Sequence, residues 1–175
     1  MLRLLAFAAL VLSAPFLAAC GSPATHNSAD VAFAQGMVPH HEQALEMTEL
    51  VDSRTDSPHV VELATRIAKA QEPEIEQLNG RLREWGAPVQ ASAHTAHGHA
   101  DDHGMVELGN LADLRGSDFD RQWLSLMIQH HRGAVEMARK HLDAGTDPAT
   151  RKLAQDVIAA QEKEIAEMES LLPQG

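Results

Sequence analysis

The sequence predicts an all-α protein, an antiparallel four-helix bundle made of two duplicated helical hairpins. Only 3% of the 175 residues are aromatic and none is Tyr, which disfavours β-sheets, whereas Ala and Leu are abundant and favour helices. Apolar residues recur every three to four positions through most of the chain. The chain also aligns with itself at an offset of 90 residues, which is typical of an internal repeat. A chain of this length forms one domain, or two small halves folded together.

The start of the chain is predicted to be a signal peptide rather than part of the fold. Arg3 precedes an apolar run from Leu4 to Leu12, and small residues follow. The sequence Leu17-Ala18-Ala19-Cys20 resembles the bacterial lipobox, whose Cys is lipid-modified and becomes the mature N-terminus. A free or buried thiol is the alternative for this Cys. We therefore expect residues 1–19 to be removed and residues 20–29 to be a lipidated Cys with its tether. The protein would be exported and lipid-anchored to the outer face of the bacterial cytoplasmic membrane, or would lie in the periplasm.

The rest of the chain, residues 30–175, is predicted to form the bundle, and residues 30–86 form its first hairpin. A helical apolar pattern fills the first part of this hairpin and breaks shortly before Ser57. Ser57 is then placed to cap a second helix, with Pro58 at the first helical position. Gly86 ends that helix.

Residues 116–172 repeat this pattern as the second hairpin. Ser117 with Asp120 is predicted to open the third helix, and Gly145 to close it. Asp147 is placed to cap the fourth helix. The identical pairs at the repeat offset include Met37 with Met127, His40 and His41 with His130 and His131, Ala44 with Ala134, Met47 with Met137, Gln71 with Gln161, and Glu74 with Glu164.

Residues 87–115 join the hairpins as a crossover of different character. The segment lacks apolar periodicity and gathers His and Asp among small residues. We expect a flexible collector that captures metal ions and delivers them inward; a solvated linker with weak metal affinity is the alternative. Its candidate ligands are His94, His97, His99, His103 and Met105.

The repeated Met and His residues are the candidate metal site. At about 100° per residue, the two Met and the two His of each copy share one arc of a helix, with a small Ala at its centre. Imidazole and thioether donors together favour copper, particularly Cu(I), with zinc or iron as alternatives. A packed His pair, hydrogen-bonded to polar residues of the return helices, is the alternative without metal. The candidate ligands are Met37, His41, Met127 and His131 foremost, and then His40, His130, Met47 and Met137.

Two Gln-Glu pairs on the return helices are the candidates for orienting these His side chains. An acidic group beside a ligating imidazole can fix its tautomer, although helix carboxylates can equally cap turns or stay solvated. The residues concerned are Gln71, Glu72, Gln161 and Glu162, each pair followed by a further acid, Glu74 or Glu164. Three other His have no counterpart at the repeat offset and are predicted to lie on the surface, namely His26, His59 and His141.

Charge and motif content exclude several classes of function. The 14 Lys and Arg against 25 Asp and Glu give a net charge of -11, which repels nucleic acid and anionic lipid heads. The predicted membrane contact is therefore the lipid anchor alone. The chain has no Gly-x-Ser-x-Gly elbow, phosphate-binding Gly loop or dinucleotide fingerprint, so an enzyme would have to depend on a metal. No Glu-x-x-His sequence occurs, which argues against a carboxylate-bridged di-iron centre.

The two Met/His segments resemble the signature of the bacterial family named domain of unknown function 305. They read MVPHHEQALEM over residues 37–47 and MIQHHRGAVEMA over residues 127–138, with Gln129 in the second where the first has Pro39. The resemblance covers nearly all of residues 33–172. It implies a ferritin-like helical bundle, often exported. Because some members are periplasmic copper-binding proteins implicated in copper resistance, it also implies copper ligation by the His and Met of both segments.

Three hypotheses about function are compatible with these observations. The leading one is an exported lipoprotein that binds copper and buffers it, confers resistance or passes it to a copper-handling partner, without turning over a substrate. The second is a metal-dependent oxidoreductase of ferritin-like type. The third is a surface interaction lipoprotein without a metal, in which the His and Met residues serve only packing.

Overall fold

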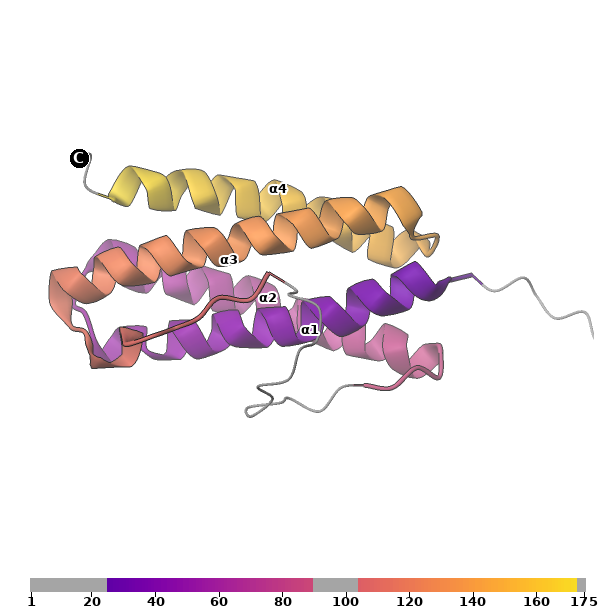
Figure 1. The fold of residues 1–175 in the computed structure, drawn as a ribbon, viewed down its shortest axis with the longest axis horizontal. Helices are drawn as coiled ribbons and strands as arrows, with labels where there is room; N and C mark the ends of the chain where they lie inside the picture. The colour runs from indigo at the N-terminus through magenta and orange to yellow at the C-terminus, as the bar shows by residue number, and fades with distance from the viewer. Residues whose placement is uncertain (1–24, 90–103, 173–175) are drawn as a thin grey trace, which may run out of the picture.

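The predicted all-α bundle is confirmed by the computed structural model, which describes residues 25–89 and 104–172. The helices are α1 (Ser28–Glu49), α2 (Pro58–Glu84), α3 (Gly116–Ala144) and α4 (Pro148–Leu171), with short 3-10 turns η1 (Val51–Ser53) and η2 (Leu111–Asp113). Figure 1 shows the four helices side by side along the long axis of the molecule. The predicted signal peptide, Cys20 and the four His of the crossover lie outside the described residues.

The two hairpins pack through their first helices. α1 packs against α2 and α3 against α4, and the hairpins meet along α1 and α3 (Figure 1). Among the described helices, none combines the length and the hydrophobicity that crossing a bilayer requires. The two repeats thus contact each other mainly through α1 and α3.

The helix caps follow the sequence in part. Asp147 caps α4 as expected, because its side chain accepts hydrogen bonds from the first backbone amides of that helix. Ser57 occupies the predicted cap position of α2, but its side chain makes no capping bond. The prediction that Ser117 with Asp120 opens the third helix is wrong, since α3 begins at Gly116 and has no side-chain cap. A complete capping box opens α1 instead, formed by Asn27 with Asp30 three residues later, the positions one repeat earlier.

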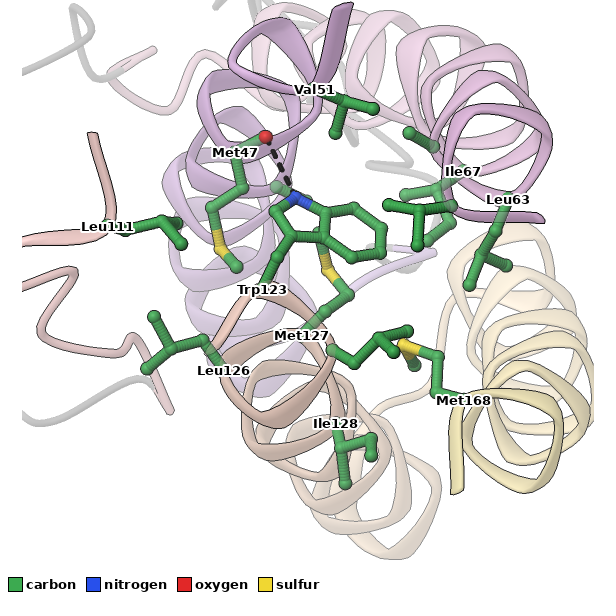
Figure 2. Packing of buried hydrophobic residues seen from close by; sticks show 14 of the residues in the cluster. Met47, Val51, Leu63, Ile67, Leu111, Trp123, Leu126, Met127, Ile128 and Met168 are labelled. Atoms are coloured by element: carbon green, nitrogen blue, oxygen red, sulfur yellow. Dashed lines mark hydrogen bonds between the residues drawn. The ribbon is translucent and has the colours of Figure 1, made fainter. Parts of the chain in front are cut away.

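Two hydrophobic clusters fill the two ends of the bundle. The Trp123 cluster lies where α1 ends and α3 begins, and Figure 2 shows its Trp123 ring donating a hydrogen bond from Nε1 to the carbonyl oxygen of Met47, 2.9 Å away. The Phe33 cluster lies at the opposite end, where α1 begins and α3 ends. Their members correspond at the repeat offset: Leu63, Ala64, Ile67 and Met168 in the Trp123 cluster match Leu153, Ala154, Val157 and Leu78 in the Phe33 cluster. The internal repeat is thus a pseudo-two-fold arrangement in the structure.

Candidate metal centre

Four His form a buried polar layer between the two hydrophobic clusters. His40 and His41 project from the middle of α1, and His130 and His131 project from the middle of α3. All four side chains are fully buried. The rings of His40 and His130 lie 3.7 Å apart between centroids, with an interplanar angle of 32°. The pair with the same place in each repeat therefore meets at the pseudo-two-fold axis.

The central pair uses Nε2 to donate to backbone carbonyls. His130 Nε2 lies 2.9 Å from the carbonyl oxygen of His40, and His40 Nε2 lies 3.3 Å from the carbonyl oxygen of Gly104, at the end of the crossover. A carbonyl oxygen only accepts, so Nε2 carries the hydrogen in both rings. The two rings therefore share one tautomer although their acceptors differ.

The outer pair uses Nε2 to donate to carboxylates of the return helices. His41 Nε2 lies 2.7 Å from Glu74 Oε2, and His131 Nε2 lies 2.9 Å from Glu164 Oε2. The two Glu side chains are 20% and 16% exposed, respectively, so each bond reaches from the core toward the surface. The contact is repeated in both hairpins, and a carboxylate in this place orients the imidazole.

The opposite ring atom, Nδ1, has no hydrogen-bond partner in the described structure for any of the four His. When Nε2 carries the hydrogen, a neutral imidazole holds its lone pair on Nδ1. Gln71 and Gln161, which are also buried, lack partners there for Gln71 Nε2, Gln71 Oε1 and Gln161 Oε1. An unsatisfied buried polar atom costs about 1–3 kcal/mol. The four unpartnered Nδ1 atoms of the His layer indicate that this layer accommodates a ligand, a metal ion or water.

Burial keeps the central imidazoles neutral. Burial, with a smaller contribution from the neighbouring His41, lowers the pKa of His40 to about 3. Burial also lowers the pKa of His130 well below its ordinary value, with His40 as the next contributor. Both rings therefore carry no charge at neutral pH, and neutral imidazole is the form that ligates metals.

The Met side chains flank the His layer on both sides. Met37 and Met137 belong to the Phe33 cluster, whereas Met47 and Met127 belong to the Trp123 cluster, so each side receives one Met from α1 and one from α3. Met37, Met47 and Met127 are fully buried, and Met137 is half-buried. Met168 on α4 is also fully buried, and sequence reasoning missed it because its repeat counterpart is Leu rather than Met. Each side of the layer thus combines thioether and imidazole donors.

Other residues of the predicted site lie away from this layer. Glu72 and Glu162 are exposed, and Glu162 pairs with Arg139 at 2.6 Å, so the acids that contact the His layer are Glu74 and Glu164. Met105 is 47% exposed on the crossover. In residues 25–89 and 104–172, no group of three or more His, Cys, Asp or Glu side chains is arranged to hold a metal ion.

The prediction of a surface position is wrong for His141, which is 3% exposed. Its ring stacks on Phe33, and its Nε2 lies 3.1 Å from Thr150 Oγ1 and 3.6 Å from Asp30 Oδ1. Burial lowers the pKa of His141, although the nearby Asp30 opposes this effect. This network joins the start of α1 to the α3–α4 turn. The self-alignment of the sequence gives no sign of it, because the repeat counterpart of His141 is Val51. Of the other two, His59 is exposed as expected, and His26 stacks on Trp85.

Comparison with known proteins places the chain in a family. The model of the family described as "Domain of unknown function (DUF305)" matches residues 30–172. A solved DUF305 fragment from Deinococcus radiodurans has 32% identity and a TM-score of 0.73, over 83% of this chain and 95% of that one.

Two further solved structures are of CopM, in its Cu(II)-bound and Cu(I)-bound forms. They share 32% and 31% identity with this chain, with TM-scores of 0.71 and 0.69, and each match covers 81% of this chain and 94% of CopM. The uncharacterized protein L153 of Acanthamoeba polyphaga mimivirus is 42% identical over 53 residues, which is 30% of this chain and 35% of the length of that curated relative. The family match spans most of the sequence and includes both Met/His segments, and the chain therefore belongs to the DUF305 family.

Proposed function

We propose that this protein is an exported lipoprotein that binds copper in the His layer of its bundle, for buffering, resistance or delivery. The observation that carries the proposal is the set of four fully buried imidazoles whose Nε2 atoms are all committed and whose Nδ1 atoms all lack partners within the described structure. The similarity to CopM, which has been solved with Cu(I), Cu(II) and silver bound, supports copper as the cargo.

The donor set favours Cu(I) over the alternatives. Cu(I) accepts soft ligands, and the layer offers neutral imidazole nitrogen beside buried thioether sulfur from both repeats. Zinc and iron sites usually recruit carboxylates or thiolates. Here the nearest carboxylates, Glu74 and Glu164, are hydrogen-bonded to Nε2 atoms of the His layer. They act as orienting groups for His41 and His131 in this proposal.

Location and mode of attachment rest on the sequence. The signal peptide pattern and the lipobox-like Leu17-Ala18-Ala19-Cys20 support export and acylation. A copper-binding domain tethered outside the cytoplasmic membrane would meet copper before it enters the cell. A copper-handling protein partner is part of this proposal as the recipient of the ion.

The test is a competitive titration of the chain from residue 22 onward, without an affinity tag, against a chromophoric Cu(I) chelator. Zn(II) and Fe(II) are titrated alongside. Replacing His40, His41, His130 and His131 by Asn should abolish tight Cu(I) binding. A matched control replaces His26 and His59 by Asn and should bind as the parent does. Unchanged affinity and stoichiometry in the fourfold variant would refute the site.

The carboxylates give a second test in a less disruptive way. Glu74→Gln with Glu164→Gln keeps the size of both side chains and an oxygen acceptor for each His, but removes the charge. We expect Cu(I) affinity to fall about 10-fold to 100-fold, the usual effect of losing a group that orients a metal-ligating His. Glu72→Gln with Glu162→Gln is the matched control, since these side chains are exposed. Equal affinity in both double variants would contradict the orienting role.

A further inference from the structure

The described end of the crossover, residues 104–106, lies directly over the His layer and is called the strap here. The carbonyl oxygen of Gly104 accepts the hydrogen bond from His40 Nε2. Two residues later, Val106 is held by the side chain of Gln43 on α1: Gln43 Nε2 donates to the Val106 carbonyl oxygen at 3.0 Å, and the Val106 amide donates to Gln43 Oε1 at 2.9 Å. One side chain thus clamps both backbone groups of one strap residue.

On the other side of the strap, its backbone lies in close contact with the backbone of α3. Gly104 has a φ of +73° and lies against Gly133 of α3. A Cβ on Gly104 would come within 2.6 Å of the Gly133 Cα, and a Cβ on Gly133 would come within 2.7 Å of the Gly104 Cα. Gly133 is the repeat counterpart of Gln43. The same position of the two repeats therefore contributes to holding the strap in different ways. Gln43 on α1 binds the strap by hydrogen bonds, and Gly133 on α3 leaves room for its backbone.

We infer that the strap is the entrance to the His layer, and that Gln43 and Gly133 hold it closed. The inference rests on the proposed function for the identity of the cargo. Because all four imidazoles are fully buried, an ion reaches them only when some part of the structure opens. The strap is held by a few hydrogen bonds and by one half-buried side chain, Val106, that packs against the Trp123 cluster, whereas the helices contribute the fully buried side chains of both hydrophobic clusters. Segments held by few contacts, such as the strap, open at a lower free energy than well-packed helices do.

The surroundings of the strap suit a soft cation. A groove of about 610 Å³ between α1 and α3 is lined by Gly104 and Gly133, by Met137, which flanks the His layer, and by the oppositely charged Glu136 and Lys140. Met105, in the middle of the strap, exposes its thioether at the surface. The other approaches to the layer lead past Glu74 and Glu164, whose carboxylates are already hydrogen-bonded to His41 and His131.

The first experiment measures strap opening in the metal-free mature chain. His40 is labelled at neutral pH with diethylpyrocarbonate, which modifies accessible neutral imidazole, and the labelling rate is read from fragment masses that separate His40 from His41. Gln43→Ala removes both clamp bonds, and Gly133→Ala pushes the strap away while favouring the α3 helix. Each should speed labelling of His40 about tenfold, the factor expected when about 1.4 kcal/mol of hydrogen bonding or contact is lost.

Two controls carry the same substitutions elsewhere. Gln35→Ala removes the bond from Gln35 Nε2 to the Pro88 carbonyl oxygen, at the other end of the crossover. Gly80→Ala adds a Cβ in α2, where it meets nothing within 4 Å. Both controls should label His40 at the parent rate. Parent-like rates in Gln43→Ala and Gly133→Ala, or equal acceleration in the controls, would overturn the inference.

The second experiment follows the ion itself. The rate at which Ag(I), used as a redox-stable probe for Cu(I), enters the protein is measured by stopped-flow mixing. Gln43→Ala and Gly133→Ala should raise this rate by the same factor as the labelling rate. Faster labelling with unchanged Ag(I) entry would place the entrance elsewhere, past the carboxylates. Faster labelling in a protein that binds no Ag(I) or Cu(I) would refute the proposed function and leave the strap as the opening segment.

Discussion

Replacing the buried Asp30 by Ala should be among the most destabilising single changes in the protein. Its carboxylate accepts hydrogen bonds from the backbone amides of Asn27, Thr146 and Asp147, at 2.7–3.1 Å, and from the hydroxyls of Thr146 and Thr150. Asp30 is fully buried, and these hydrogen bonds lower the pKa of its carboxyl, although burial itself opposes them. It stays ionised and ties the start of α1 to the α3–α4 turn.

The magnitude follows from the groups that the substitution leaves without an acceptor. Three backbone amides lose their partner, and each such loss in a buried site costs about 1–3 kcal/mol. Since two of these amides are only partly buried, we take the lower part of that range for them. The sum is about 3–5 kcal/mol, a large share of the roughly 5–15 kcal/mol that stabilises a typical domain.

The assay is equilibrium urea unfolding of the metal-free protein, followed by circular dichroism. Asp120→Ala is the matched control, because Asp120 is the repeat counterpart of Asp30 and one of its carboxylate oxygens has no partner in the described structure. The control should not lower the free energy of unfolding, because Asp120→Ala removes a buried oxygen that already lacks a partner in the described structure. A loss below 1 kcal/mol for Asp30→Ala, or equal losses for both variants, would refute the reasoning.

Two other changes test the buried His residues. The metal-free protein should lose stability as the pH falls below about 6.5. In this range His40 and His130 are protonated in the unfolded chain, whereas in the folded protein their lowered pKa values keep them neutral. The contribution of these two His to the free energy of unfolding is fully present above the pKa of His in the unfolded chain. Below that pKa it falls by up to about 1.4 kcal/mol per pH unit for each residue. A urea midpoint that is constant from about pH 6.5 to 5 would contradict this prediction. Gly145→Ala places a Cβ 2.1 Å from Cε1 of buried His141. Overpacking should cost about 1–3 kcal/mol and lower the Tm, whereas an unchanged Tm would show that this ring can move.

The helices and the buried His layer could be predicted because the signals are periodic and duplicated. Apolar spacing places each helix, and a Met/His segment that recurs on the apolar face of two helices has to enter the core. The carboxylates that contact the His layer, Glu74 and Glu164, come two residues after the predicted Glu72 and Glu162. At about 100° per residue, Glu74 lies within about 60° of the buried Gln71, whereas Glu72 is turned by about 100° toward solvent. Helical geometry alone could have selected Glu74 and Glu164.

Other contacts could not be read from the sequence because they join distant segments without repeat symmetry. The burial of His141 depends on Asp30 and on the space left by Gly145, two residues far apart in the chain. The clamp between Gln43 and Val106 likewise breaks the symmetry, since the other repeat has Gly133 at the position of Gln43. The second of these contacts involves the crossover, which has no duplicate, and the first joins two segments whose repeat counterparts have different residues, Val51 for His141 and Thr55 for Gly145.

Each hydrophobic cluster contains Met residues from both repeats, and this has a consequence for the folding of a single hairpin. Each end of the bundle draws its apolar side chains from both hairpins, and the central His pair is formed across their interface. A hairpin by itself therefore has only part of each cluster and one His of the central pair, with no closed core. Expressed separately, residues 25–89 should associate into symmetric homodimers in which the pseudo-axis becomes an exact one. The chain thus resembles a covalently linked dimer, and residues 104–106 of the linker break its symmetry where Gly104 contacts His40 of the His layer.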